Sequence, residues 1–194
     1  MHALISTLRT AILLTIVLTI LLCVVYPAAV WASGQALFPH QANGSLIVDT
    51  DGAIRGSELL GQVFSKPGYF HARPSAAGAG YDATASSGSN LGPTSEKLSN
   101  AIKANVAAYR AENGLPANAL VPADAVTASA SGLDPQISLA NAELQAPRVA
   151  RARNLPLEQI HALIEANNED RDFGILGDPG VNVLKLNRAL DALK

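Results

Sequence analysis

The longest apolar stretch of the chain lies near its amino terminus and contains no charged side chain. It runs from Ala11 to Val30, and a mainly polar chain follows it. A helix of about twenty residues spans ~30 Å, roughly the thickness of a bilayer's hydrocarbon core. Such a helix satisfies its own backbone hydrogen bonds in lipid. The pattern therefore predicts one transmembrane helix over residues 11–31 that tethers a single domain.

The charges that flank this stretch indicate which side of the membrane the domain occupies. Arg9 precedes the stretch, and the first charged side chain after it is Asp49. Because cytoplasmic flanks carry the excess of Lys and Arg, residues 1–10 are predicted to be cytoplasmic and residues 32–194 extracytoplasmic. A cleaved secretory signal is the alternative, since small residues precede Ser33. Both interpretations place the domain outside the cytoplasm.

Two short strands and a helix are expected next. Leu46 to Val48 precedes a turn-forming DTDG segment, which predicts a strand, a turn and a second strand over Ala53 to Arg55. Gly56 to Phe64 is expected to start a short helix with a serine cap. The carboxylates of Asp49 and Asp51 are expected to hold the turn, and a cation site is the alternative.

Residues 69–93 are rich in glycine, serine and alanine and have no apolar period. They are predicted to form one loop. A loop of roughly 25 residues inside a compact domain is uncommon and is usually either disordered or a binding surface. Aromatic and polar side chains argue against a plain linker, and we expect an ordered loop that covers a partner. These candidate partner-binding residues are Tyr69, Phe70, Arg73, Tyr81 and Asn90.

Helices are expected over much of the rest of the chain. Apolar residues recur every three or four positions between Thr94 and Gly114. Asp134 and the proline after it have the composition of a helix start, and this helix is expected to break near Pro147. Further helices are expected to begin near Pro156 and Asn182. The elements together predict an α+β fold that is helix-rich and has a small β-sheet.

Charge and cysteine content narrow the function classes. The formal net charge is −2, with Lys and Arg scattered, so the chain has no basic field for nucleic acid. Cys23, the only cysteine, lies in the apolar stretch, which excludes disulfides and thiolate metal sites from the domain. The four histidines occur in no HExxH or HxxxH spacing, so we expect no zinc centre.

Motifs for ATP chemistry are missing from the sequence. It has neither a glycine-rich phosphate loop with lysine nor a DKTGT-like segment. Ser129 and Ser131 precede a turn as a nucleophile would, but G-x-S-x-G is absent, and their hydroxyls are expected to hold that turn. An anchored extracytoplasmic serine hydrolase that pairs either serine with His71 remains an alternative. A free-standing ligand-binding module is another.

One segment concentrates positive charge and an amide. It contains Gln145, Arg148, Arg151 and Arg153. Guanidinium groups bind phosphate through paired hydrogen bonds, so this set is a candidate site for a phosphate or a nucleotide. A solvated helix face is the other interpretation.

Four segments of the chain stand out together. They are GSLIVDTDGAIRGSELLGQVFSKPGYFHARPSA, SGSNLGPTS, DAVTASASGLDPQISLANAELQAPRVARARN and GILGDPGVNVLKLNRALD. In this order they resemble the C subunit of the bacterial Kdp potassium-transporting ATPase. The shorter motifs RPSA, GSNLGP and TASASGLDP are jointly very specific, and the resemblance covers nearly the whole predicted domain.

The resemblance implies an accessory subunit that does not itself hydrolyse ATP. Its partners would be a channel-like potassium-translocating subunit, a P-type ATPase catalytic subunit and a very small single-span subunit in the inner membrane. Family members are described as stabilising this complex and raising the ATP affinity of the catalytic subunit. We expect the loop over residues 69–93 to dock on the outer face of the translocating subunit. The turn with Ser129, Ser131 and Asp134 is expected to dock with it.

The predicted topology conflicts with direct nucleotide contact. A domain outside the cytoplasm cannot touch ATP held by a cytoplasmic nucleotide domain, so ATP is implied as a cofactor only through the complex. Any effect on nucleotide is therefore expected to be indirect, through the translocating subunit or the membrane helix. For direct contact, Gln145, Arg148 and Arg151 match the family segment LQ-x-x-R-V-A best.

Overall fold

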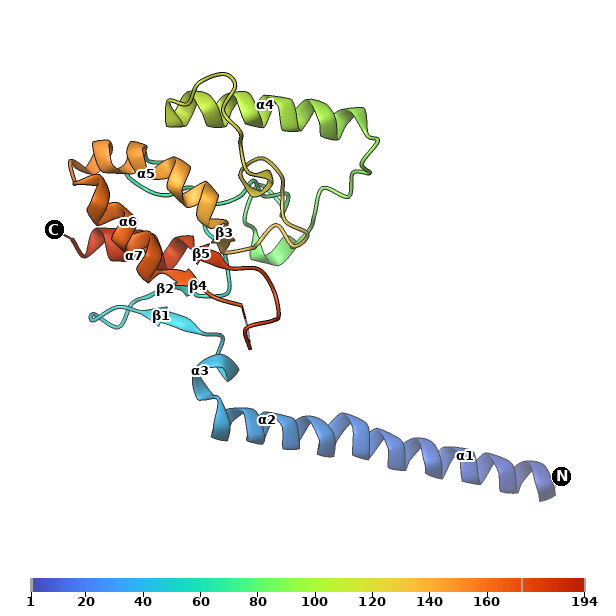
Figure 1. Cartoon of the computed structure of the whole chain (residues 1–194). Coiled ribbons are helices and arrows are strands. Elements are labelled where there is room, and N and C mark those ends of the chain that lie inside the picture. The colour runs from blue at the N-terminus through green and yellow to red at the C-terminus, as the bar shows by residue number, and fades with distance from the viewer. Residues whose placement is uncertain (1, 172, 194) are drawn as a thin grey trace. The chain divides into compact units, whose positions relative to one another are not determined.

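The computed structural model describes residues 2–171 and 173–193. The chain divides into two compact units, Met1–Ser57 and Glu58–Lys194, and Figure 1 labels the elements of each. The first unit has a long amino-terminal helical segment and a two-stranded hairpin, and the second has helices and a three-stranded sheet. This combination confirms the predicted α+β class.

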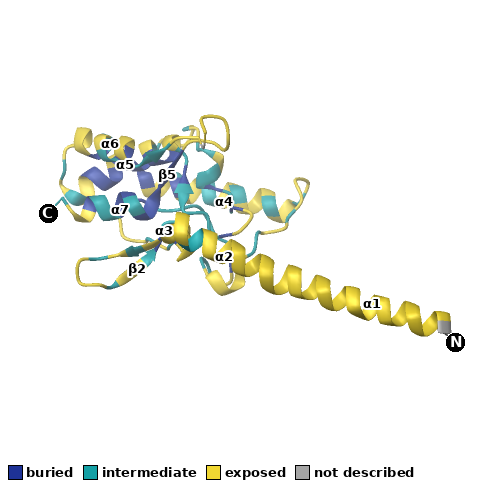
Figure 2. Cartoon of the chain, turned by 90° about the horizontal axis from the view of Figure 1, so that it is seen from below, coloured by how far each residue is buried: buried dark blue, intermediate teal, exposed yellow. Residues whose placement is uncertain are grey.

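The apolar stretch is helical, as predicted. α1 (His2–Ile20), a π-helical segment (Leu21–Val25) and α2 (Tyr26–Leu37) follow one another without a break. Its side chains are almost all exposed, and Figure 2 shows α1 and α2 mostly in yellow. By length and composition, Ala3–Leu37 is one helix long and apolar enough to cross a membrane.

Pro27 explains the π-helical segment. Proline has no N–H to donate to the carbonyl of Cys23, four residues back, and its ring collides with that carbonyl in a regular helix. In the structure, the N–H of Tyr26 donates to the carbonyl of Leu21, five residues back. This wider turn accommodates the proline, so the helix continues to Leu37.

The hairpin of the first unit confirms the predicted strand, turn and strand. After the short helix α3 (Pro39–Ala42), β1 (Leu46–Val48) pairs antiparallel with β2 (Ile54–Ser57). The turn carboxylates bind within the hairpin, because Arg55 contacts Asp49 at 2.6 Å and Asp51 at 3.3 Å. Their role is to hold the turn, as expected.

The short helix predicted over residues 56–64 is absent. Ser57 lies in β2 and its hydroxyl donates to the carbonyl of Gly44 at 2.7 Å, so it does not cap a helix. Further along, the N–H of Gly61 donates to the carbonyl of Leu133 at 2.8 Å. This long-range hydrogen bond takes the place of the local bonds of a helix. The helix propensity of the segment is too weak to outweigh it.

Three helices of the second unit confirm their predictions. α4 (Glu96–Asn113) has Ser95 as its N-cap and ends at Gly114, whose φ is 67°. α6 (Leu157–Ala166) follows Pro156, and α7 (Val183–Asp191) has Asn182 as its N-cap. The predicted loop over residues 69–93 is irregular apart from a 3₁₀ turn at Ala83–Ala85, and a second 3₁₀ turn lies at Ala123–Ala125.

The start and end predicted for the next helix are wrong. α5 (Leu139–Arg153) begins after a short strand, β3 (Gln136–Ile137), and its N-cap is Ser138 rather than Asp134. Pro147 lies inside α5 and does not break it. Since Pro147 is on the exposed side of the helix, water can bind the carbonyl that its missing N–H leaves free.

A second small sheet joins the core of the second unit. β5 (Gly180–Asn182) lies between β3 and β4 (Asn168–Glu169), and both pairings are antiparallel. α5 packs on α6 and β5, and α6 packs on α7. Figure 2 shows buried residues on α5, β5 and α7. The core comprises Phe70, Ile137, Ala142, Ala146, Val149, Ala150, Ile160, Ile164, Val181, Val183, Leu186 and Leu190.

Candidate functional site

The two loops that carry the predicted partner-binding residues lie against each other. Arg73 Nη1 contacts Asp134 Oδ2 at 2.8 Å, and both side chains are half-buried. The hydroxyl of Ser75 donates to the carbonyl of Gly132 at 2.6 Å, and the N–H of Ser87 donates to the carbonyl of Ser131 at 3.0 Å. We term these two joined segments, residues 69–93 and 129–136, the loop layer.

The backbone of the loop layer is closely packed at Gly132, which has a φ of 69°. A Cβ there would lie 2.7 Å from both the nitrogen of Ala77 and the carbonyl oxygen of Ser87. Only glycine fits this turn. Ser129 Oγ accepts from the N–H of Gly132 at 2.9 Å, so that serine holds the turn as expected.

The second serine has the same role. Ser131 Oγ accepts from the N–H of Leu133 at 3.1 Å. The histidine that a hydrolase would need has other partners, because His71 Nδ1 lies 2.7 Å from a carboxylate oxygen of Glu112 and Nε2 lies 3.1 Å from the carbonyl of Lys66. This arrangement does not provide the serine–histidine pair of a hydrolase.

Tyr81 stabilises the loop layer through a hydrogen bond within residues 69–93. Its hydroxyl donates to the carbonyl of Arg73 at 2.6 Å, and its backbone has a φ of 57°. Burial, followed by the charge of Asp134, raises the pKa of Tyr81 to about 12. Gly61 packs against the ring, since a Cβ there would lie 2.5 Å from Tyr81 Cε1.

A hollow of about 550 Å³ opens on the loop layer. Arg73 and Asp134 line it beside Ser129 and Ser131, so the structure brings together four of the predicted partner-binding residues. Arg73 Nε is buried and, among the described residues, has no hydrogen-bond partner. The remaining lining residues are all apolar: Leu59, Leu60, Ala130, Leu133 and Pro135.

Three more predicted partner-binding residues belong to the loop layer but do not line this hollow. Phe70 is fully buried in the core, and its N–H donates to Asn187 Oδ1 at 2.8 Å. Tyr69 is half-buried under Arg153, whose guanidinium carbon lies 4.5 Å from the centre of the ring. Asn90 is exposed at a φ of 52°. Of these three, Asn90 alone is presented freely to a partner.

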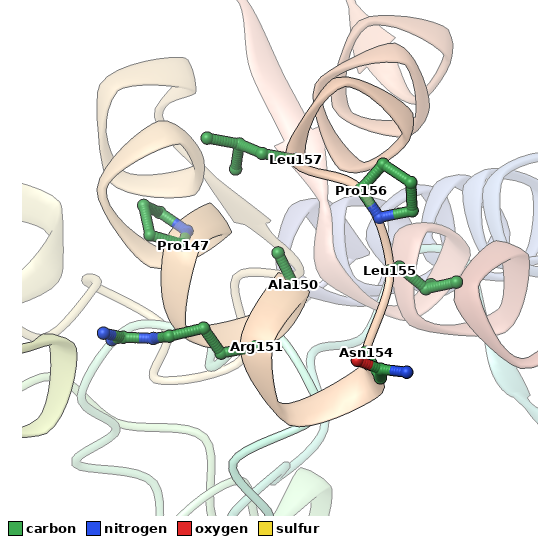
Figure 3. Close-up of a pocket in the computed structure, with 7 residues that line it drawn as sticks. All are labelled: Pro147, Ala150, Arg151, Asn154, Leu155, Pro156 and Leu157. Carbon is green, nitrogen blue, oxygen red and sulfur yellow. The ribbon is translucent and has the colours of Figure 1, made fainter.

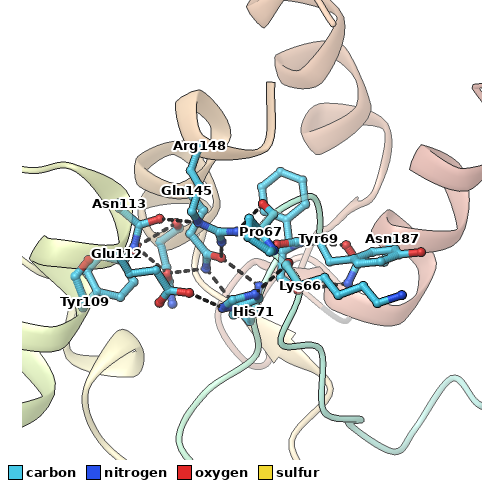
Figure 4. Close-up of polar contacts among 12 residues, drawn as sticks. Lys66, Pro67, Tyr69, His71, Tyr109, Glu112, Asn113, Gln145, Arg148 and Asn187 are labelled. Carbon is cyan, nitrogen blue, oxygen red and sulfur yellow. Dashed lines mark hydrogen bonds and ion pairs between the residues drawn. The ribbon is translucent and has the colours of Figure 1, made fainter. Parts of the chain in front are cut away.

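Arg148 lies at the centre of a buried polar network, which Figure 4 shows. The side chain is 6% exposed. Nε donates to Asn113 Oδ1 at 2.9 Å, and Nη2 donates to Gln145 Oε1 at 2.8 Å. Nη1 donates to the carbonyls of Pro67 and Tyr69, at 2.6 and 2.9 Å. Burial lowers the pKa of Arg148.

Gln145 extends this network to the loop layer. It is 1% exposed, and its amide bonds both backbone groups of His71, accepting from the N–H at 2.8 Å and donating to the carbonyl at 3.0 Å. Nε2 also donates to Asn141 Oδ1 at 2.9 Å. Gln145 and Arg148 therefore attach the start of the loop layer to α5. A phosphate bound by both would have to displace these bonds.

The remaining arginines of this segment lie apart from the network. Arg153 Nε donates to the carbonyl of Gly68 at 2.7 Å, and its Nη2 contacts Asp191 at 2.8 Å. Arg151 is exposed and lines a hollow of about 550 Å³ between α5 and α6, which Figure 3 shows. The hollow is otherwise lined by Pro147, Ala150, Asn154, Leu155, Pro156 and Leu157.

Comparison with known proteins identifies the family. The family described as "K+-transporting ATPase, c chain", KdpC, matches residues 8–192. The chain belongs to the KdpC family. It is 58% identical over 187 residues to the potassium-transporting ATPase KdpC subunit of Caulobacter vibrioides, a match that covers 96% of this chain and 93% of that relative.

Further KdpC relatives match over a similar extent. The KdpC subunit of Mycobacterium tuberculosis is 56% identical over 183 residues, covering 94% of this chain and 96% of that protein. The KdpC subunit of a Caulobacter species is 54% identical over 187 residues, covering 96% and 94%. As a KdpC chain, the protein is an accessory chain of the potassium-transporting ATPase and not its catalytic subunit.

Proposed function

We propose that this chain stabilises an ATP-driven potassium uptake complex by docking its loop layer on the outer face of the potassium-translocating subunit. The observation that carries the proposal is the hollow around Arg73 and Asp134, where apolar side chains surround a half-buried ion pair. The buried centres of interfaces are mainly apolar and are enriched in arginine. The catalytic P-type subunit and a small single-span subunit complete the assembly.

A bulky substitution in the hollow tests this docking. Ala130 is exposed and lines the hollow, so Ala130→Arg should block the surface without disturbing the core. Ala101→Arg, at an exposed position on α4, is the matched control. We expect A130R to reduce co-purification with the translocating subunit at least tenfold and A101R to leave it unchanged. Equal recovery of the two variants would contradict the docking.

The proposal includes a topology in which residues 1–10 are cytoplasmic, residues 11–31 span the inner membrane and residues 32–194 lie outside. Its support is the position of Arg9 before the apolar helix. A cysteine placed at exposed Ser89 in a Cys23→Ser background tests it. An impermeant maleimide should label this cysteine in intact spheroplasts. Labelling only after lysis would place the domain inside.

We infer that the chain raises the ATP affinity of the catalytic subunit indirectly, through the docked translocating subunit. The inference draws support from the bonds that already occupy Gln145 and Arg148. Arg151 is the residue of this set that remains exposed. Arg151→Ala should therefore leave the ATP dependence of the assembled ATPase within about twofold of the original, whereas A130R should raise the ATP concentration required. The reverse result would favour direct nucleotide contact.

A further inference from the structure

A second exposed surface lies in the connection from β4 to β5. Phe173, Ile175 and Leu176 are 92%, 76% and 56% exposed, although all three are large apolar side chains. Exposed apolar residues scattered singly are ordinary, but three within four positions form a local patch. We term residues 173–176 the apolar finger.

The residues on either side of the finger are held together, and we term them its base. β4 and β5 pair antiparallel just outside it, with Glu169 opposite Gly180. Arg171 Nη2 contacts Asp178 Oδ1 at 3.0 Å across the base. Phe173 has a φ of 54°, a left-handed conformation that a bulky side chain rarely adopts. Residues with strained backbones of this kind cluster at functional sites.

The base of the finger is continuous with the loop layer. A hollow of about 240 Å³ is lined on one side by Arg73 and Asp134. Asp178, Pro179 and Gly180, which lead from the finger into β5, line the same hollow. A partner seated on the loop layer at this hollow would therefore lie next to the base of the finger.

The charges around the finger distinguish between a membrane and a protein as its partner. Three carboxylates, those of Glu169, Asp170 and Asp178, lie beside it. Lys185 contacts Glu169 at 3.0 Å and Arg171 contacts Asp178 at 3.0 Å, so the third carboxylate, that of Asp170, leaves the base net acidic. An anionic lipid surface attracts basic segments and repels acidic ones. The acidic base therefore disfavours insertion into lipid and favours a protein surface with positive charge around an apolar centre.

We propose that the apolar finger inserts into an apolar recess, rimmed by Lys or Arg, on the outer face of the subunit that receives the loop layer. This inference rests on the proposed docking and adds a second contact to it. The finger supplies the apolar anchor, and the exposed carboxylate of Asp170 faces the basic rim. Interfaces concentrate binding energy in such central apolar residues.

Photo-crosslinking identifies what the finger touches. Phe173→Cys in a Cys23→Ser background, labelled with benzophenone maleimide, is irradiated within the assembled complex in native membranes. Leu120→Cys is the control, since Leu120 is 90% exposed in a different loop. We expect F173C to give an adduct with another protein subunit and L120C to give none. A lipid adduct, or an adduct only with a second copy of this chain, would overturn the proposal.

Substitution measures the contribution of the finger. Phe173→Ser and Ile175→Ser should each cut retention of the chain in the washed complex at least tenfold, and Leu120→Ser should not. Asp170→Lys, at an exposed position, should also reduce retention, because it reverses the charge that faces the basic rim. Full retention of D170K would contradict the proposal that Lys or Arg side chains rim the recess.

The outcomes separate this inference from the docking proposal. If the finger variants are retained while A130R is lost, the finger is not a contact and the loop-layer docking stands. If the finger variants and A130R are all retained, the docking itself is wrong. Thermal unfolding of each full-length variant in detergent checks folding, and these exposed positions should leave it unchanged.

Discussion

Arg148 is the side chain on which the buried polar contacts of the second unit converge. Its guanidinium donates hydrogen bonds to Asn113, to Gln145 and to the carbonyls of Pro67 and Tyr69, where the loop layer begins. The sequence singled out Gln145 and Arg148 by charge and spacing. It could not indicate their burial, because their partners at Pro67 and Tyr69 lie far away along the chain and are backbone groups that carry no motif.

Arg148→Met should therefore destabilise the fold strongly. It leaves buried acceptors without a donor, and we expect a loss of ~3 kcal/mol in the free energy of unfolding. Arg151→Met is the matched control, because Arg151 is also an arginine and lies three positions further along, on the exposed face of α5. It should change the free energy of unfolding by no more than ~0.5 kcal/mol. Denaturant unfolding of the full chain in detergent measures both. Similar losses for the two variants would contradict the structural role of Arg148.

The pH dependence of Tyr81 is a second prediction at this scale. Its pKa is raised from 10.0 to about 12, so the folded state favours the neutral phenol. The stabilisation is complete below about pH 10 and is lost as the pH rises through about 12. Tyr81→Phe removes one hydrogen bond, which costs ~1 kcal/mol at pH 8. The difference in stability between the two proteins should narrow toward high pH, and a constant gap would contradict it.

At the scale of elements, the sequence predicted a helix correctly where the segment contains its own capping residues and a helical repeat of apolar positions. α4, α6, α7 and the β1–β2 hairpin were predicted because repeating apolar residues or turn residues define them within one segment. β3, β4 and β5 are two or three residues long and are stabilised by pairing across long sequence separations. The predicted start of α5 was wrong for the same reason, because Gln136 and Ile137, shortly after Asp134, form β3.

The cap of α5 provides the test at this scale. Ser138 Oγ accepts from the N–H of Asn141 at 3.2 Å and donates to Asp124 Oδ1 at 2.8 Å. Ser138→Ala should cost ~1 kcal/mol of stability, within the range for N-cap residues. Ser99→Ala, at an exposed position within α4, should be neutral or slightly stabilising because alanine has the higher helix propensity. Thermal unfolding distinguishes the two, and an unaffected S138A would rule out the cap.

At the scale of the whole molecule, the packed core and the candidate membrane-spanning helix lie in different parts of the chain. The hydrophobic core and the partly buried residues on it all lie between Phe64 and Leu190. The side chains of α1 and α2 are almost all exposed and contribute nothing to that core. An exposed apolar helix of this length needs lipid around it, whereas the second unit has a buried hydrophobic core of its own.

A chain that begins at Phe38 should therefore fold without a membrane. We expect it to be soluble, to have the helical content of the second unit and to unfold in one cooperative step, because its core is complete. A shorter chain that begins at Leu115 lacks Phe70 and α4, and it should fail to unfold cooperatively. Circular dichroism during heating compares the two. A non-cooperative transition for the longer chain would mean that the apolar helix takes part in folding, and the separation of packing from attachment would not hold.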